Sequence, residues 1–323
     1  MTDSRPVRHL LILHAGSLGD CALAVSLALR MKAAWRDPAV VMAARSSLAK
    51  WARRRGLIDQ VASLDAAIAP LSSHDDERPP DSTVELLGKF DLIVSFLGDA
   101  STPASRRLSA TLGRPVVHLD PKLTDAARRD GAHITDQWAA ELTRRGFPLP
   151  PLVGGGQLPP RRPLDLTLRD RLAAHLSTAG HKIALCHPGS GGLDKCCPLE
   201  AMEQLIGGLR EQGWAVGWMV GPDEVERFGR PYLARLRQSA PVVYEESVEE
   251  AAELVSGADA YVGFDAGMTH VAALTGVTTL ALFGPTDPRT WRPPWESCRV
   301  AGFPPQSGAT WDVNEALSCI AAW

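Results

Sequence analysis

The sequence lacks any apolar run long enough to cross a membrane. A helix that spans a bilayer needs about 20 consecutive apolar residues, and none of the apolar stretches in these 323 residues approaches that length. The first strand-like segment, Leu10 to Leu13, follows a short polar start and is too short for the apolar core of a secretory signal. We therefore expect a cytoplasmic protein.

The sequence also lacks an excess of positive charge. Its 34 lysine and arginine residues are outnumbered by 37 aspartate and glutamate residues, which gives a net charge of −3. Proteins whose main task is to bind nucleic acid present a basic surface. Nucleic acid is therefore not an expected partner.

Motifs for metals and for two common nucleotide folds are missing. None of the six cysteines forms a C-x-x-C pair, and the adjacent Cys196 and Cys197 cannot easily bridge one another, so we expect reduced thiols and no zinc site. The chain has no G-x-x-x-x-G-K-[ST] phosphate loop. It also has no G-x-G-x-x-G fingerprint, which disfavours an NAD-dependent oxidoreductase.

What the chain does contain is a regular alternation of strand-like and helix-like segments. Its length favours two domains, and the Pro- and Gly-rich run FPLPPLVGGGQLPPRRP cannot form a regular element. We predict two α/β domains with parallel sheets that face a central cleft. The predicted bounds are 1–150 for the first domain, 151–165 for a linker, 166–308 for the second domain, and 309–323 for a closing helix that can pack back on the first domain.

The stretch from Val262 to Pro288 carries the strongest pattern. A buried strand over 260–264 leads into the turn Asp265 to His270, and a short helix over 271–275 precedes a strand over 278–283. Such a turn lies between the carboxyl end of a strand and the amino end of a helix, where free N–H groups suit a phosphate. We expect Asp265 to cap the helix and orient the turn.

Three other loops follow predicted strands. In the first, Asp20 is either an ordinary helix cap or a general base. In the second, His187 to Gly192, the Ser190 hydroxyl and nearby Lys195 can bind phosphate, unless this is only a surface loop. In the third, Glu224 or Glu226 can hold ribose hydroxyls or belong to a solvated first helical turn.

Three motifs in this order resemble glycosyltransferase family 9, the heptosyltransferase-like family of bacterial lipopolysaccharide assembly. They are SLGD, HPGSGG-x-x-K and DAGMTHVAALTGVTTLALFGPTDP, and together they span most of the chain. The resemblance implies a GT-B fold with two Rossmann-like domains, the acceptor site in the first and the nucleotide-sugar site mainly in the second. It also implies an inverting enzyme that needs neither a metal nor another cofactor.

The resemblance further implies a role for each matching residue. Asp20 is the expected general base, which removes the proton of the acceptor hydroxyl, and Lys195 stabilises the departing diphosphate. Glu224 (or Glu226) is expected at the ribose, and Glu246 and Val248 at the base. The donor-binding positions implied are Ser17, Ser190, Glu224, Glu246, Val248, Asp265, Ala266, Gly267, Met268 and His270.

The expected reaction is transfer of a heptose from ADP-heptose to a saccharide acceptor of the lipopolysaccharide core, with the enzyme in the cytoplasm or at the cytoplasmic face of the inner membrane. The acceptor can be lipid-linked. Alternatives are transfer of another sugar to a small molecule or protein, and a sugar-nucleotide-binding protein without catalysis. Cys196 and Cys197 stand where the family usually has a basic or polar residue and a tryptophan. That departure leaves the identity of the donor open.

Overall fold

The chain separates into two compact units, Met1–Leu152 and Val153–Trp323. The computed structural model describes residues 6–68, 81–97, 106, 109–110, 112–113, 116–150, 166–178, 181–303, 311 and 313–321. The predicted linker, 151–165, lies outside these described residues. None of the helices that they form combines the length and the apolar character needed to cross a membrane.

The first unit is built on a parallel sheet with the strand order β3-β2-β1-β4-β5. Its apolar strands alternate between two faces, so that Leu11 and Leu13 point to one side and Leu10 and Ile12 to the other. The strands are β1 (His9–His14), β2 (Ala39–Ala44), β3 (Gln60–Ala62), β4 (Leu92–Ser95) and β5 (Val116–His118).

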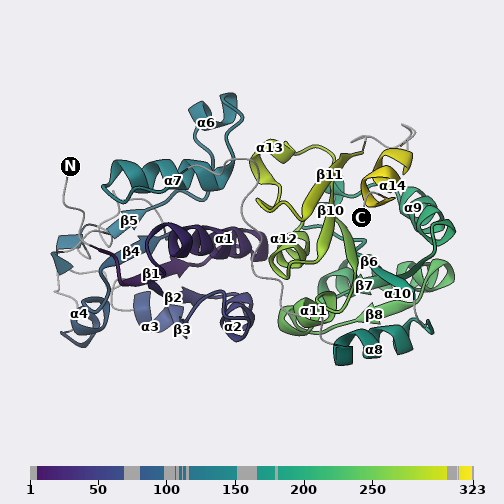
Figure 1. Cartoon of the computed structure of the whole chain (residues 1–323), viewed down its shortest axis with the longest axis horizontal. Coiled ribbons are helices and arrows are strands. Elements are labelled where there is room, and N and C mark those ends of the chain that lie inside the picture. Colours follow the sequence, from purple (N-terminus) through teal and green to yellow (C-terminus); the bar gives the residue numbers. More distant parts are fainter. Residues whose placement is uncertain are drawn as a thin grey trace. The chain divides into compact units, whose positions relative to one another are not determined.

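Helices cover both faces of this sheet (Figure 1). Leu64, Ala67 and Leu87 pack against Leu11 and Leu13 on one face. The long helix α1 lies with α2 and α7 on the other face. The helices are α1 (Leu18–Ala34), α2 (Leu48–Arg54), α3 (Leu64–Ile68), α4 (Asp81–Leu87), α6 (Asp125–Arg129) and α7 (Ile134–Arg144).

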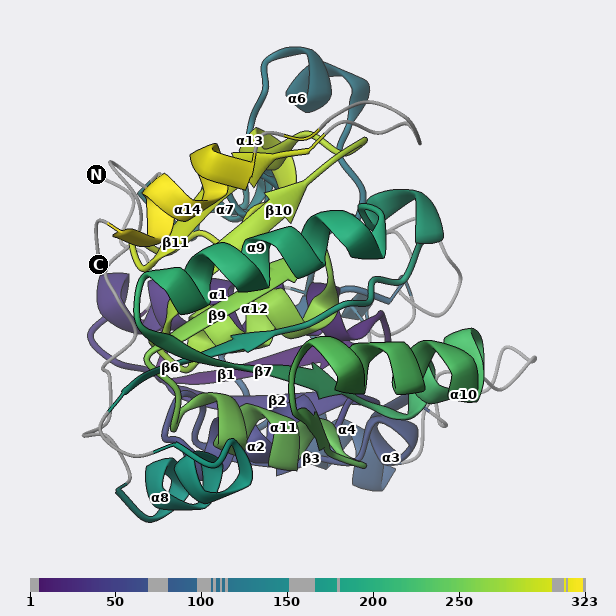
Figure 2. The same cartoon turned by 90° about the vertical axis from the view of Figure 1, so that its right-hand side faces the viewer.

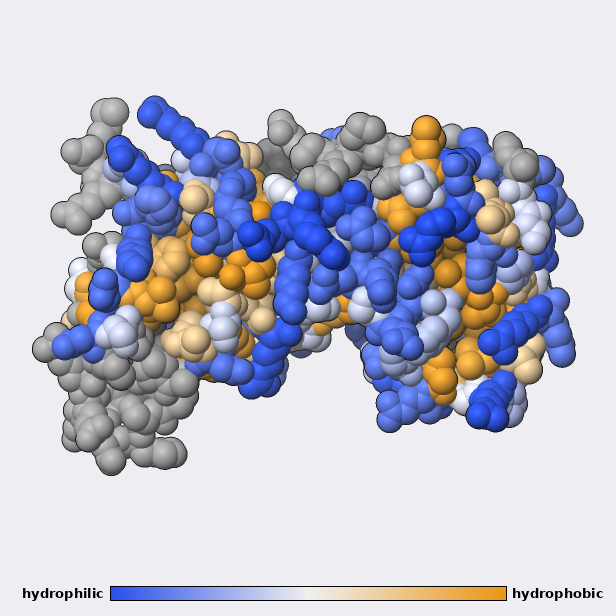
Figure 3. Space-filling view, turned by 90° about the horizontal axis from the view of Figure 1, so that it is seen from below, coloured by the Kyte–Doolittle hydropathy of each residue, from blue (hydrophilic) through white to orange (hydrophobic). Residues whose placement is uncertain are grey.

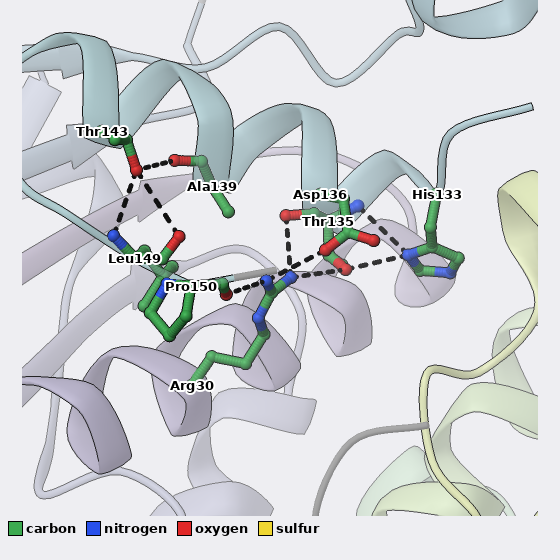
Figure 4. A network of polar contacts seen from close by, with 8 residues as sticks. All are labelled: Arg30, His133, Thr135, Asp136, Ala139, Thr143, Leu149 and Pro150. Atoms are coloured by element: carbon green, nitrogen blue, oxygen red, sulfur yellow. Dashed lines mark hydrogen bonds and ion pairs between the residues drawn. The ribbon is translucent and has the colours of Figure 1, made fainter. Parts of the chain in front are cut away.

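A buried arginine fastens α1 to α7 and to the last described residue of this unit (Figure 4). Arg30 Nη1 donates to the carbonyl and hydroxyl oxygens of Thr135 at 2.9 and 3.0 Å, and Nη2 donates to the carbonyl of Pro150 at 2.8 Å. Its Nη2 also pairs with Asp136 at 3.0 Å. The N-cap of α7 is His133, whose ring nitrogen accepts the N–H of Thr135 at 3.2 Å.

The second unit has a six-stranded parallel sheet with the order β11-β10-β9-β6-β7-β8. Two parallel sheets with flanking helices confirm the predicted α/β class. The edge strand β11, which pairs with β10, was not predicted. The strands are β6 (Lys182–Cys186), β7 (Trp214–Val220), β8 (Val242–Tyr244), β9 (Ala260–Phe264), β10 (Thr278–Phe283) and β11 (Cys298–Gly302).

Neighbouring residues of the central strands point to opposite faces of the sheet and belong to two separate hydrophobic cores. Val262 faces α9, α10 and α14, whereas Tyr261 faces α8, α11 and α12. Figure 2 shows α9 and α14 lying across one side of this sheet. The helices are α8 (Leu166–His175), the short 3₁₀ helix η2 (Leu193–Lys195), α9 (Leu199–Glu211), α10 (Pro222–Ser239), α11 (Val248–Val255), α12 (Gly267–Leu274), α13 (Pro288–Trp291) and α14 (Val313–Ala321).

The C-terminal helix packs within the second unit. Ala316 and Ile320 of α14 are buried in the core that α9 also lines, and the Trp311 indole donates to the carbonyl of Gly302 at 2.8 Å. The apolar face of α14 finds its partners on α9, β10 and β11.

The surface mixes polar and apolar side chains, as the face drawn in Figure 3 shows. Among the described residues, the large apolar side chains that are exposed belong to four different elements: Leu86, Leu166, Leu193 and Tyr244. Scattered apolar residues of this kind are normal on a globular surface. One of them, Leu193, lies in the loop that also carries Lys195.

Candidate functional site

Both sheets have a topological switch point, where the strand order reverses beside the first strand of the unit. In the first unit this point lies between β1 and β4, and in the second between β6 and β9. Open α/β sheets bind ligands outside the carboxyl ends of the strands at such points. The first turn of α1, which follows β1, carries Asp20, the loop after β6 carries Ser190 and Lys195, and the turn after β9 carries Asp265.

In the second unit an ion pair joins two of the predicted site residues. Lys195 Nζ donates to Asp265 Oδ2 at 2.7 Å. The same carboxylate oxygen accepts the hydroxyl of Thr286 at 2.8 Å, from the loop after β10. The lysine side chain is one-third exposed and the aspartate side chain only 9%, so the pair presents the ammonium group outward.

Ser190 bridges the same two loops. Its hydroxyl donates to the carbonyl of Asp265 at 2.7 Å, and the residue is buried. Arg227 of α10 donates to the carbonyl of Ser190 from the other side. Loops after β6 and β9 and the start of α10 are thereby connected, although 75 residues separate Ser190 from Asp265 in the sequence.

The turn after β9 leads directly into helix α12, which begins at Gly267 and not at Val271 as expected. Its N-cap is Ala266, which has extended backbone angles and makes no side-chain cap bond. Asp265 therefore does not cap this helix, because its carboxylate binds Lys195 and Thr286. The amino end of α12, with Gly267 and Met268 in its first turn, offers N–H groups and the positive end of the helix dipole to an anion. His270 is buried in the same helix.

Glu224 lies beside the loop after β6, which carries His187 and Gly189. Its Oε2 accepts the N–H of Gly221 at 2.8 Å, and its Oε1 lies 3.4 Å from Nε2 of His187. Burial raises the pKa of Glu224, but the attraction and hydrogen bonding of His187 and the N–H of Gly221 outweigh it, and the pKa is lowered. Of the two glutamates left open by the sequence, Glu224 is the buried one that joins this cluster, while Glu226 is exposed.

Glycine is required where Glu224 packs against the loop. A Cβ on Gly189 would lie 2.2 Å from Glu224 Oε1, which is far inside any contact distance. The His187 ring in turn stacks on Tyr261, with ring centroids 6.5 Å apart. The loop after β6 is thus packed tightly onto the glutamate.

The remaining donor positions lie farther along the sheet edge. Glu246 and Val248 flank Ser247, the N-cap of α11, after the edge strand β8. Glu246 is exposed and Val248 is half-buried. The strand β7 lies between β6 and β8, so these residues stand apart from the Lys195–Asp265 pair within the same unit.

In the first unit, Asp20 is a helix cap partner. Ser17 is the N-cap of α1 and forms a capping box with Asp20, in which Ser17 Oγ donates to Asp20 Oδ2 at 2.9 Å. The N–H of Ser17 also donates to Oδ2, at 3.3 Å. Oδ1 accepts no hydrogen bond from the residues described. The cap of this helix is therefore Ser17 and not Asp20, which supports it from the third helical position, and the Asp20 carboxylate remains half-buried with one oxygen available.

A buried histidine lies next to this carboxylate. His14 at the end of β1 is only 1% exposed, and its ring packs edge-on against Phe96, which packs against Trp138. A Cβ on Gly16 would lie 3.0 Å from the His14 ring and 3.2 Å from Asp20 Oδ2, so both groups border the same glycine. Burial lowers the pKa of His14 to about 4, against the opposing attraction of Asp20.

Three contributors to these sites were not predicted, Thr286, Arg227 and His14, and His187 belonged to a predicted loop but had been given no role. Each lies within a few residues of the carboxyl end of a strand, or in the second turn of a helix that starts there. That placement was the only available signal, since their partners are distant in sequence.

The six cysteines are free in the structure, as expected. Burial raises the pKa of Cys196 to about 11 and that of Cys197 to about 12. Both thiols are therefore uncharged near neutral pH. Cys197 belongs to the core beside α9, whereas Cys196 is partly exposed next to Lys195.

The sequence profile of glycosyltransferase family 9 (heptosyltransferase) matches residues 155–315. Lipopolysaccharide heptosyltransferase 1 of Pseudomonas aeruginosa is 35% identical over 213 residues, which cover 62% of this chain and 56% of that protein. Lipopolysaccharide heptosyltransferase 1 of Escherichia coli K12 is 30% identical over 158 residues, 48% of each chain. The chain thus matches about half the length of these curated relatives.

Two solved structures are similar in fold over nearly the whole chain. The ADP-heptose lipopolysaccharide heptosyltransferase II of E. coli superposes with a TM-score of 0.65 and 19% identity, and covers 98% of both chains. The E. coli heptosyltransferase WaaC with ADP gives a TM-score of 0.63 and 17% identity, covering 97% of this chain and 99% of that one. The fold is therefore that of the GT-B heptosyltransferases.

Proposed function

The chain is a glycosyltransferase family 9-like protein, and from this we propose that it transfers a heptose from ADP-heptose to a saccharide acceptor of the lipopolysaccharide core. The names of its relatives support the reaction and the acceptor class. The donor is suggested by E. coli ADP-heptose lipopolysaccharide heptosyltransferase II, which shares the fold.

The observation that carries this proposal is the Lys195–Asp265 pair at the switch point of the second unit. A departing nucleoside diphosphate concentrates negative charge that the protein must balance. Lys195 Nζ, fixed by Asp265 at 2.7 Å, and the amino end of α12 supply positive charge and N–H donors at adjoining loops. We propose that these groups allow transfer with neither a metal nor another cofactor.

Asp20 is the proposed general base. Its free carboxylate oxygen takes the proton of the acceptor hydroxyl while that oxygen forms a bond to the anomeric carbon of the sugar. The bond between the anomeric carbon and the diphosphate oxygen breaks on the opposite face, and its electron pair leaves with ADP. One carboxylate suffices for such a direct displacement, which inverts the anomeric configuration.

The other donor contacts are proposed from the same arrangement. Ser190 and the first turn of α12 bind the diphosphate, and Ser17 contributes near the phosphates from the first unit. Glu224 holds the ribose, and Glu246 and Val248 line the base. We propose further that the protein acts in the cytoplasm, with a lipid-linked acceptor reached at the inner membrane surface.

The deciding experiment combines nucleotide binding with turnover. Thermal melting with ADP, GDP, UDP and TDP should show stabilisation by ADP above the others, since a ligand that binds the folded state raises the melting point. A preference for another nucleotide would mean that the donor is not ADP-heptose.

The second test measures turnover with ADP-heptose and a core acceptor, where Asp20→Asn should reduce transfer by roughly a hundredfold or more. If Asp20→Asn binds ADP and transfers as fast as the wild type, this mechanism is wrong. A protein that binds ADP without any transfer would be a sugar-nucleotide-binding protein instead.

A further inference from the structure

Helix α10 is interrupted close to the candidate site. Gly229 has φ 72° and ψ 179°, outside the helical region, and Pro231 follows two residues later. Residues 222–228 therefore form a separate first segment that starts at the carboxyl end of β7. Because the helix is broken at Gly229, the axis of this first segment need not follow the axis of the rest of α10.

Two residues of this segment contact the loop after β6. Glu224 and Arg227 are three residues apart and share one helix face. Glu224 packs against Gly189, and Arg227 Nη1 donates to the carbonyl of Ser190. The guanidinium group is thereby held at the loop that carries Ser190 and Lys195.

The two cations at this loop differ in how their charge is balanced. Lys195 is paired with Asp265, whose side chain is 9% exposed. Arg227 is exposed, and within the part of the chain that the structure describes it forms no ion pair with a carboxylate. Arginine stays charged at all ordinary pH values. Arg227 therefore brings to the loop a positive charge that forms no ion pair among the described residues.

A neighbouring thiol feels this charge. Burial raises the pKa of Cys196 to about 11, and the charge of Arg227 is among the effects that oppose the rise. Cys196 follows Lys195 directly in the sequence, and the charges of Glu224 and Asp194 act on the same thiol in the opposite sense to Arg227. Because the Cys196 thiol is uncharged near neutral pH, it does not neutralise Arg227. Arg227 is therefore the second cation at the loop after β6, beside Lys195.

We propose that Arg227 binds the donor diphosphate as a second cation beside Lys195 and makes the site selective for nucleoside diphosphates over monophosphates. This inference rests on the proposed function. One N–H of the guanidinium is used by Ser190, and the four others can donate to phosphate oxygens. A monophosphate can satisfy one of the two cations, whereas a diphosphate can reach both.

Calorimetry with ADP and with AMP tests the proposal on four proteins: the wild type, Arg227→Gln, Arg227→Lys and Arg230→Gln. Arg227→Gln should weaken ADP binding roughly tenfold or more and AMP binding much less, because a charge-assisted contact to the second phosphate is lost. Arg227→Lys should recover part of the affinity for ADP. Arg230→Gln removes the same charge beyond the Gly229 interruption and should change ADP binding by less than about twofold.

The outcomes separate the two proposals. If Arg227→Gln binds ADP like the wild type, or loses ADP and AMP affinity equally, the role of Arg227 is wrong, while a loss of ADP binding in Lys195→Ala would still support the proposed function. If the wild type binds no nucleoside diphosphate, both proposals fail. Circular dichroism of Arg227→Gln checks that the fold is retained, which we expect because the side chain is exposed.

Discussion

Lys195 Nζ lies 2.7 Å from Asp265 Oδ2, across 70 residues of sequence. The oxygen that holds the lysine is itself held by the Thr286 hydroxyl at 2.8 Å. A lysine side chain has many rotamers, so an anchored carboxylate keeps its ammonium group in one place. The position of the Lys195 charge therefore depends indirectly on Thr286, whose hydroxyl holds the Asp265 carboxylate.

Replacing Thr286 by valine tests this dependence. Thr286→Val keeps the volume but removes the hydrogen bond, so Asp265 loses one of two restraints. Because such a bond contributes about 1 kcal/mol, ADP affinity should fall roughly fivefold. Thr286→Ser, which keeps the hydroxyl, is the matched control and should stay within about twofold of the wild type. Equal calorimetric affinities for the valine variant and the wild type would show that Thr286 does not position Lys195.

Two glycines of one loop provide a sharper contrast. A Cβ at position 189 would lie 2.2 Å from Glu224 Oε1, whereas a Cβ at Gly191 would meet no atom within 4 Å. Gly189→Ala must displace Glu224, and we expect it to lower the free energy of unfolding by about 1–3 kcal/mol and to weaken ADP binding. Gly191→Ala should change the free energy of unfolding by less than about 0.5 kcal/mol. Denaturant melts and calorimetry measure both effects. Similar results for the two variants would mean that Glu224 does not pack against Gly189 as described.

The regular part of the fold could be predicted because buried parallel strands are continuous apolar runs. The strands over 260–264 and 278–283 coincide with β9 and β10. The strand β11, CRVAG, was missed because Arg299 and Gly302 interrupt its apolar pattern. The side chain of Arg299 donates to the carbonyl of Cys319 in α14, a partner that only the folded chain brings near.

The candidate site was predictable as loops but not as contacts. Motif spacing led to Ser190, Lys195 and Asp265, because each follows a strand at the same sheet edge. It could not choose between Glu224 and Glu226, which lie in the first turns of the same helix. In the folded chain Glu224 packs against Gly189, a residue of another loop, whereas Glu226 is exposed.

The buried Arg30 network predicts a large effect on stability in the first unit. Arg30→Met removes the donors to the carbonyls of Thr135 and Pro150 and the ion pair with Asp136. We expect a loss of about 2–4 kcal/mol in the free energy of unfolding, because two carbonyls lose a charged donor in a buried place. The matched control is Arg145→Met, which breaks an exposed pair with Glu141 and should cost less than about 1 kcal/mol. Comparable denaturation midpoints for the two variants would contradict the structural role of Arg30.

His14 predicts a dependence of stability on pH. Burial holds the pKa of His14 at about 4, below its ordinary value of 6.5. The unfolded chain therefore takes up this proton first, so that the stability contributed by neutral His14 is complete above pH 6.5 and is lost as the pH falls towards 4. Between about pH 7.5 and about pH 5 this group should lower the free energy of unfolding by roughly 2 kcal/mol.

The measurement is the difference between denaturant melts at these two pH values in the wild type and in His14→Gln. The substitution can destabilise the protein at both pH values, but the amide does not titrate, so the difference between the two melts should shrink by most of that amount. His181→Gln, a replacement on the surface, is the control for removing a histidine. If His14→Gln loses as much stability on acidification as the wild type, the ring is not held neutral by burial, and the surroundings of His14 must be more hydrated than its 1% exposure indicates.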